Sequence, residues 1–106
     1  MLDLDQSELD IVKNILAKHI PQYEVHAFGS RVTNNAKQFS DLDLVIITDK
    51  KLPWQKLEAI RDDFSASDLS IMVDIHDWQA ISREFRKIIE QKYVIIQMTD
   101  DKNCPV

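Results

Sequence analysis

The largely apolar run from Leu42 to Thr48 constrains the fold of this chain more than any other stretch of the sequence. The run is rich in valine and isoleucine, and because β-branched residues favour extended structure, it predicts a buried strand. Ile71–His76 is a second strand candidate, and Glu24–Phe28 is also predicted to be extended. Apolar strands of this kind need helices to cover their faces. The sequence therefore predicts a layered fold built around a sheet.

Helices are predicted on either side of these strands, because apolar residues recur there at helical spacing. The first helix covers residues 7–20 and ends before Pro21, the second begins at Pro53, and the third begins at Ser82 after a short helix capped by Asp77. The apolar faces predicted for the three main helices are Leu9, Val12, Leu16 and Ile20, then Trp54, Leu57, Ile60 and Phe64, then Phe85, Ile88, Ile89 and Tyr93. The order helix, strand, loop, strand, helix, strand, helix predicts a small α+β (α/β) fold with helices on a central sheet.

Length and charge limit the functions that such a domain can have. The 106 residues fit one domain, 1–106, with a frayed end from about residue 100. Eighteen acidic against thirteen basic residues give a formal charge of -5, which argues against non-specific binding of nucleic acid but not against a nucleotide held through a metal ion.

The single cysteine and the absence of long apolar segments indicate where the protein works. Cys104 alone cannot form an internal disulfide or a cysteine zinc cage, which fits a reducing compartment. The acidic N-terminus shows no secretory signal, and no apolar run approaches the ~20 residues of a membrane span. We therefore expect a cytoplasmic protein without a membrane partner.

Two carboxylates at the start of the apolar run carry the first chemical signal. Asp41 and Asp43 should point to the same face of the strand, with Cα atoms roughly 6–7 Å apart. Like charges on a buried strand repel each other and lose hydration, unless a divalent cation offsets them. Asp74 lies inside the other apolar strand and completes a three-carboxylate cluster if the two strands are neighbours. Oxygen ligands of this kind suit two Mg²⁺ ions, with Mn²⁺ as an alternative.

Gly29, Ser30 and Arg31 carry the second signal. Gly29 is the only glycine in the chain, and it directly follows an extended segment. Without a Cβ, it lets backbone N–H groups approach a phosphate closely. Ser30 adds a hydroxyl and, if a helix begins there, the positive end of that helix. Arg31 adds a charged fork of donors. This turn is therefore the candidate nucleotide-binding element.

The Gly-Ser turn and the Asp-x-Asp pair each have a simpler structural interpretation when taken alone. A lone Gly-Ser is an ordinary turn, and an Asp-x-Asp at a strand start is often a cap, but the two together with a buried third acid favour a functional site. His76 shares the face of Asp74 and is an alternative metal ligand, but the predicted metal set consists of Asp41, Asp43 and Asp74. Trp54 and Trp78 are predicted to pack in the core rather than to stack on a base.

The spacing of these residues resembles a known signature. Gly29-Ser30, then ten residues, then Asp41-x-Asp43 is similar to the motif of the nucleotidyltransferase superfamily that includes DNA polymerase beta. The short length and the segments AFGSRV and FSDLDLVII resemble its minimal nucleotidyltransferase (MNT) branch. The likeness covers about residues 8–97. The chain departs from the pattern at Thr33-Asn34, where many relatives carry Arg-Gly.

The resemblance implies a mixed sheet flanked by helices and an enzyme that transfers AMP from ATP to a hydroxyl. Gly29 and Ser30 would contact the triphosphate, Asp41 and Asp43 would bind metal, and Asp74 would bind metal and help to deprotonate the acceptor. Small members of this branch often act as antitoxins that adenylylate a tyrosine of a helical HEPN toxin.

Other functions stay open at this point. A non-catalytic antitoxin that neutralises a helical partner by occlusion is one alternative, and nucleotidyl transfer to a small molecule is another, although no acceptor domain is visible. A metal-dependent nuclease would leave Gly29-Ser30 without a purpose.

Overall fold

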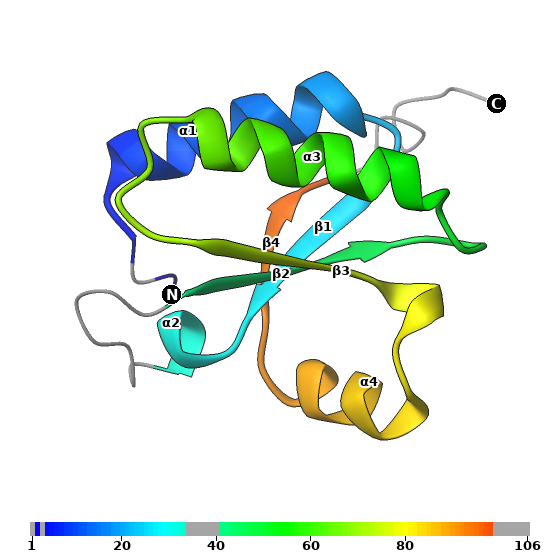
Figure 1. Ribbon diagram of the computed structural model, residues 1–106. Coiled ribbons are helices and arrows are strands. Elements are labelled where there is room, and N and C mark those ends of the chain that lie inside the picture. The colour runs from blue at the N-terminus through cyan, green and yellow to red at the C-terminus, as the bar shows by residue number, and fades with distance from the viewer. Residues whose placement is uncertain (1, 3, 34–40, 99–106) are drawn as a thin grey trace, which may run out of the picture.

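A four-stranded sheet organises the computed structural model, which describes residues 2, 4–33 and 41–98 (Figure 1). The described elements are α1 (Gln6–His19), β1 (Glu24–Phe28), α2 (Ser30–Thr33), β2 (Leu42–Ile47), α3 (Trp54–Ala66), β3 (Val73–Asp77), the 3₁₀ turn η1 (Trp78–Ala80), α4 (Arg83–Gln91) and β4 (Val94–Gln97). The strand order is β3-β2-β1-β4, in which β1 is antiparallel to β2 and β4, and β2 is parallel to β3. The predicted mixed sheet with flanking helices is therefore confirmed.

The main hydrophobic core lies between one face of the sheet and the helices α1 and α3 (Figure 1). Leu42, Leu44 and Ile46 alternate along β2 onto this face and are fully buried. They pack with helix residues that include Val12, Leu16, Ile60 and Phe64. Each large aliphatic side chain buried in this way contributes about 1.5–3 kcal/mol. This burial fixes the orientation of β2, so that the residues between the three face the opposite side.

The opposite face of the sheet is covered by α4 over only part of its length. Val45 of β2, Phe28 of β1 and Ile89 of α4 form a second, smaller cluster. Further along β2 and β3 on this face, Asp43 is half-buried and Asp74 is exposed. The fold therefore leaves the two carboxylates at an accessible end of the face.

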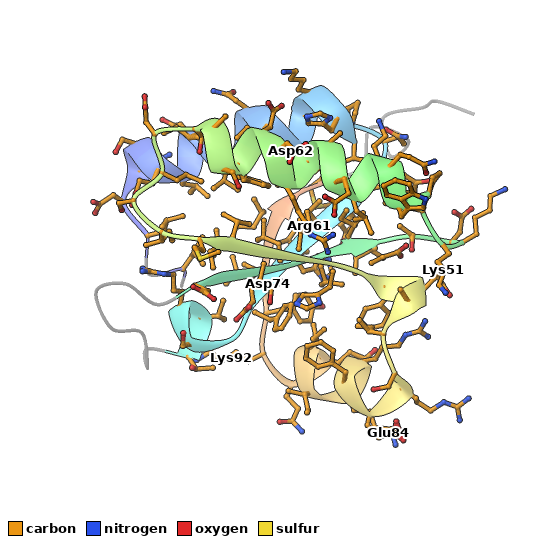
Figure 2. The ribbon with its side chains drawn as sticks, in the orientation of Figure 1. Lys51, Arg61, Asp62, Asp74, Glu84 and Lys92 are labelled. Carbon is orange, nitrogen blue, oxygen red and sulfur yellow. The ribbon has the colours of Figure 1, made fainter. Side chains whose placement is uncertain are left out.

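The helix α3 carries the chain from β2 to its parallel neighbour β3, because parallel strands need a crossover connection. Arg61 of α3 donates from Nη2 to the carbonyl oxygen of Ile75 at 3.3 Å. In Figure 2, Arg61 lies on the α3 side of β3 and Asp74 lies on the opposite side. The helix thus supports β3 from behind, on the face away from the carboxylates.

Asp77 holds the far end of β3 in place. It is only 2% exposed, and its carboxylate accepts hydrogen bonds from Thr48 Oγ1 at 2.6 Å, from the Leu52 amide at 2.7 Å and from the Gln79 amide at 3.0 Å. The Gln79 bond caps the turn η1, so the cap predicted at Asp77 is confirmed. These bonds tie β3 to the chain that leaves β2 and so help to fix the pairing of the two strands.

The prediction missed one strand and placed several exposed side chains in the core. The fourth strand, Val94–Gln97, was not predicted, and Tyr93 precedes it instead of lying inside a helix. Several side chains predicted to be buried are exposed, namely Trp54 at 70%, Ile88 at 61% and Tyr93 at 43%. Trp78, in contrast, is partly buried and packs against the second cluster, as predicted.

No helix among the described residues has both the length and the apolar character needed to cross a bilayer. The predicted frayed end from about residue 100 lies outside the described residues, and so does Cys104.

Candidate active site

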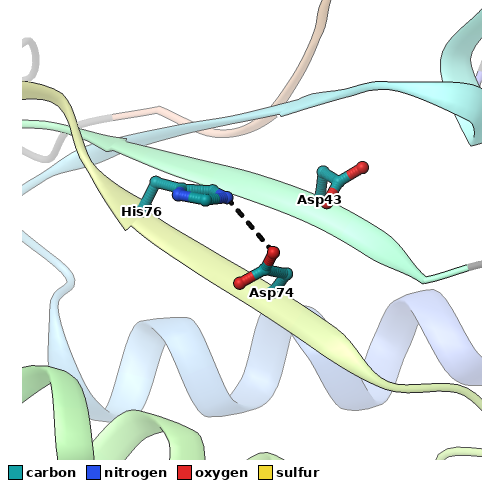
Figure 3. A group of neighbouring side chains, drawn as sticks. All are labelled: Asp43, Asp74 and His76. Carbon is teal, nitrogen blue, oxygen red and sulfur yellow. Dashed lines mark ion pairs between the residues drawn. The ribbon is translucent and has the colours of Figure 1, made fainter. Parts of the chain in front are cut away.

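Asp43 and Asp74 lie directly opposite each other on the parallel strands β2 and β3. Both side chains are on the face that α4 covers only in part, and His76 of β3 lies beside them (Figure 3). One ligand atom from each of the three residues lies within 4.8 Å of the others. The strands are neighbours, which was the condition for a carboxylate cluster. The register of the two strands therefore assembles a group of donors that suits a divalent cation.

The electrostatics at Asp43 favour such a cation. Burial raises the pKa of the Asp43 carboxyl above its usual range, and the neighbouring charges of Asp74 and Asp41 raise it further. The charge of the nearby His76 lowers this pKa, but the effects that raise it prevail. Ionised Asp43 is therefore under-compensated by the described protein groups, and a bound cation would remove this deficit.

Neutralising Asp43 should stabilise the cation-free protein. A carboxyl whose pKa is raised on folding stabilises the folded state below its unfolded pKa, and this contribution is lost as the pH rises through the folded pKa. At pH 7, in the presence of a chelator, we expect Asp43→Asn to unfold at a higher temperature than the wild type. The gap should close as the pH falls below about 3.9, where the unfolded carboxyl is itself protonated.

Adding Mg²⁺ at pH 7 provides the control for this prediction. A ligand that binds only the folded state stabilises it, so Mg²⁺ should raise the melting temperature of the wild type more than that of Asp43→Asn. Differential scanning fluorimetry measures all four conditions. An Asn variant that is less stable than the wild type in the chelator would show that Asp43 is well compensated without a cation.

Gly29 connects the turn after β1 to this carboxylate. Its φ is +85°, a conformation that L-residues with side chains rarely adopt. A Cβ at this position would collide with Asp43 Oδ2. The carbonyl oxygen of Gly29 accepts hydrogen bonds from the amides of Val32 at 3.0 Å and Thr33 at 3.2 Å, which opens α2. Glycine is therefore required for both its backbone conformation and the space that Asp43 occupies.

Ser30 and Arg31 begin α2 but differ in their surroundings. Ser30 is half-buried and directly follows the Gly29 turn. Arg31 is only 7% exposed. The pKa of Glu8 in α1 is lowered mainly by hydrogen bonds from Ser70, and the charge of Arg31 lowers it further. Arg31 is therefore within electrostatic range of α1, and its role in nucleotide binding stays a prediction.

Asp41 lies just before β2 and is exposed. It does not belong to the close group of Asp43, Asp74 and His76, but its charge raises the pKa of Asp43. Asn34, half of the departure from the family motif, lies outside the described residues. The structure thus brings Asp43, Asp74 and Gly29 together and places Asp41 within electrostatic range of them.

His76 is the member of the group that the predicted metal set left out. Its Nε2 atom is 3.4 Å from Asp74 Oδ2. The signal available in the sequence was its spacing, because residues two apart on a strand share a face. Only the sheet register shows that this face also carries Asp43.

A family model and a named relative each match most of this chain. The family model described as "Polymerase beta, Nucleotidyltransferase" matches residues 6–102. A Haemophilus influenzae protein named "Probable protein adenylyltransferase MntA" is 48% identical over 96 residues, which cover 91% of this chain and 84% of that protein.

Solved structures with low sequence identity share the fold. A crystal structure described as a toxin-antitoxin with AMP-PNP superposes with a TM-score of 0.72 at 19% identity, covering 90% of this chain and 77% of that one. A second, of a tri-AMPylated Shewanella oneidensis HEPN toxin in complex with MNT antitoxin, superposes with a TM-score of 0.68 at 18% identity, covering 94% of this chain and 77% of that one.

Proposed function

Because this chain belongs to the polymerase beta nucleotidyltransferase family, we propose that it transfers AMP from ATP to a hydroxyl group, namely a tyrosine of a HEPN-type partner protein. The placement of Asp43 opposite Asp74, with Gly29 against Asp43, is the observation that carries the proposal. The identity to an adenylyltransferase and the AMPylated toxin in a complex of the same fold support the acceptor. We place the reaction in the cytoplasm.

The donor set fits a divalent cation, Mg²⁺ or Mn²⁺. Asp43 and Asp74 lie close enough to share one, and burial together with the charge of Asp74 raises the pKa of Asp43, a cost that a bound cation would offset. Asp41, which is exposed and lies just before β2, would contribute a further carboxylate. When bound, two such cations neutralise phosphate oxygens and favour displacement at phosphorus.

The residues of the chain then have distinct tasks. Gly29 and Ser30 would hold the β- and γ-phosphates of ATP through the turn that opens α2, with Arg31 as a further proposed contact. Asp74 would orient the acceptor hydroxyl and accept its proton. A bond forms between the acceptor oxygen and the α-phosphorus, and the bond to the bridging oxygen breaks, so that pyrophosphate leaves with the electron pair. Positioning and electrostatic stabilisation supply most of the rate enhancement in such transfers.

Mass spectrometry of a HEPN partner from the same genome tests this proposal. After incubation with the chain, ATP and Mg²⁺, we expect the partner to gain one or more AMP masses on tyrosine. A reaction without ATP is the control. A partner that is inhibited but unmodified would support the rival function, in which the chain neutralises the partner by occlusion. An unmodified and fully active partner would contradict both.

A further inference from the structure

His76 lies between the carboxylates and the aromatic cluster under α4. Its ring packs edge-on against Phe85 of α4, with ring centroids 5.4 Å apart, and at a tilt against Phe28 of β1, with ring centroids 5.7 Å apart. Phe28 and Phe85 also contact each other, with centroids 5.6 Å apart. The imidazole side chain is 24% exposed, against 55% for Asp74. Two aromatic rings thus hold the imidazole in place while Nε2 faces Asp74 (Figure 3).

The separation of His76 from Asp74 is informative. At 3.4 Å, Nε2 and Oδ2 are further apart than in a good N–H···O hydrogen bond. Ligands about 2.1 Å from one ion lie about 3 Å apart when adjacent and about 4.2 Å apart when opposite. The observed separation falls within this range. One donor atom from each of Asp43, Asp74 and His76 lies within 4.8 Å of the others. Only a small movement of these side chains is needed to bring all three separations into the range expected for ligands of one ion. Exposed Asp74 has the freedom to make that adjustment.

We propose that His76 supplies a nitrogen ligand to the cation held by Asp43 and Asp74, so that this site favours Mn²⁺ over Mg²⁺. Mg²⁺ is bound almost entirely through oxygen, whereas transition ions accept imidazole readily and bind more tightly to mixed N/O sites. The inference rests on the proposed function only in taking a divalent cation to bind at these carboxylates.

Titration of the purified chain with Mn²⁺, followed by electron paramagnetic resonance, tests this ligand directly. His76→Phe keeps an aromatic ring against Phe28 and Phe85 but removes the nitrogen. We expect it to bind Mn²⁺ at least about tenfold more weakly than the wild type, while Mg²⁺ affinity, measured by competition, changes much less. His26→Phe is the matched control, since His26 lies on the same sheet face but stacks on Tyr93, and it should bind Mn²⁺ like the wild type.

The outcomes separate this inference from the proposed function. Equal Mn²⁺ affinity in the wild type and His76→Phe would overturn the inference even if AMP transfer is observed. So would a wild type that binds no Mn²⁺ either in the absence or in the presence of a non-hydrolysable ATP analogue. His76-dependent Mn²⁺ binding without AMP transfer would overturn the proposed function and leave the inference standing. Thermal unfolding checks that His76→Phe is folded. If this variant does not fold, His76→Gln, which also lacks the imidazole, takes its place in the titration.

Discussion

Replacing Asp41 and Asp43 together by asparagine should abolish AMP transfer while the chain stays folded. The amides keep the size of the side chains but remove two negative charges, so a cation at the site loses most of its electrostatic attraction. We expect the rate to fall by about 10³-fold or more, because stabilisation of transition-state charge is usually the largest single contribution to catalysis. Transfer of label from ATP carrying a labelled α-phosphate to the partner protein measures the loss.

The fold should survive because neither carboxylate belongs to the core. Asp41 is exposed, and Asp43 lies on the partly covered face with a raised pKa. Asp62→Asn is a suitable control, because Asp62 is an exposed acid on the outer helix α3 (Figure 2) and should leave both rate and stability unchanged. A folded double variant that still labels the partner would place the reaction elsewhere in the chain.

Gly29→Ala should damage both stability and activity. Alanine at φ +85° costs about 1–2 kcal/mol in backbone strain, and its Cβ would push against the Asp43 carboxylate. We expect the free energy of unfolding to fall by about 2 kcal/mol or more and the transfer rate to fall by at least about 100-fold, since small misplacements of reacting groups have effects of that size. Chemical denaturation and the transfer assay give the two numbers.

Gly29→Asn separates the two causes. Asparagine tolerates the left-handed region better than alanine, so part of the lost stability should return. Its Cβ meets Asp43 in the same way, so activity should stay low. If either variant retained full activity, the close approach of the turn to Asp43 would be unnecessary for the reaction.

The main elements of the fold were predictable where pattern and chemistry agree. The run Leu42–Ile47 is rich in valine and isoleucine and is bounded by polar residues, and α1 ends next to Pro21 as its pattern predicts. The strand Val94–Gln97 was missed because Ile88, Ile89 and Tyr93 continue a helical spacing towards it without a glycine or proline to mark the break. Periodicity alone cannot distinguish a short apolar strand from the continuation of a helix.

The sequence predicted candidate residues for the site, but not how they are arranged relative to one another. Alternation along each strand places Asp41 with Asp43 and Asp74 with His76, but it does not say which residues of two strands lie opposite each other. That pairing depends on the crossover through α3 and on the anchoring of Asp77. For the same reason, the contact between Gly29 and Asp43 could not be read from sequence, although Gly29 was singled out as the only glycine.

The parallel register of β2 and β3 links the packing of the core to the assembly of the candidate site. A slip of one residue would turn Asp43 or Asp74 towards α1 and α3 and expose leucine and isoleucine side chains in exchange. Such a molecule would lose the core contacts of the shifted strand and would be much less stable than the native fold. The burial of the apolar face thus also determines which residues lie on the opposite face. A molecule that has folded with this core should therefore carry Asp43 and Asp74 in the register that the site needs.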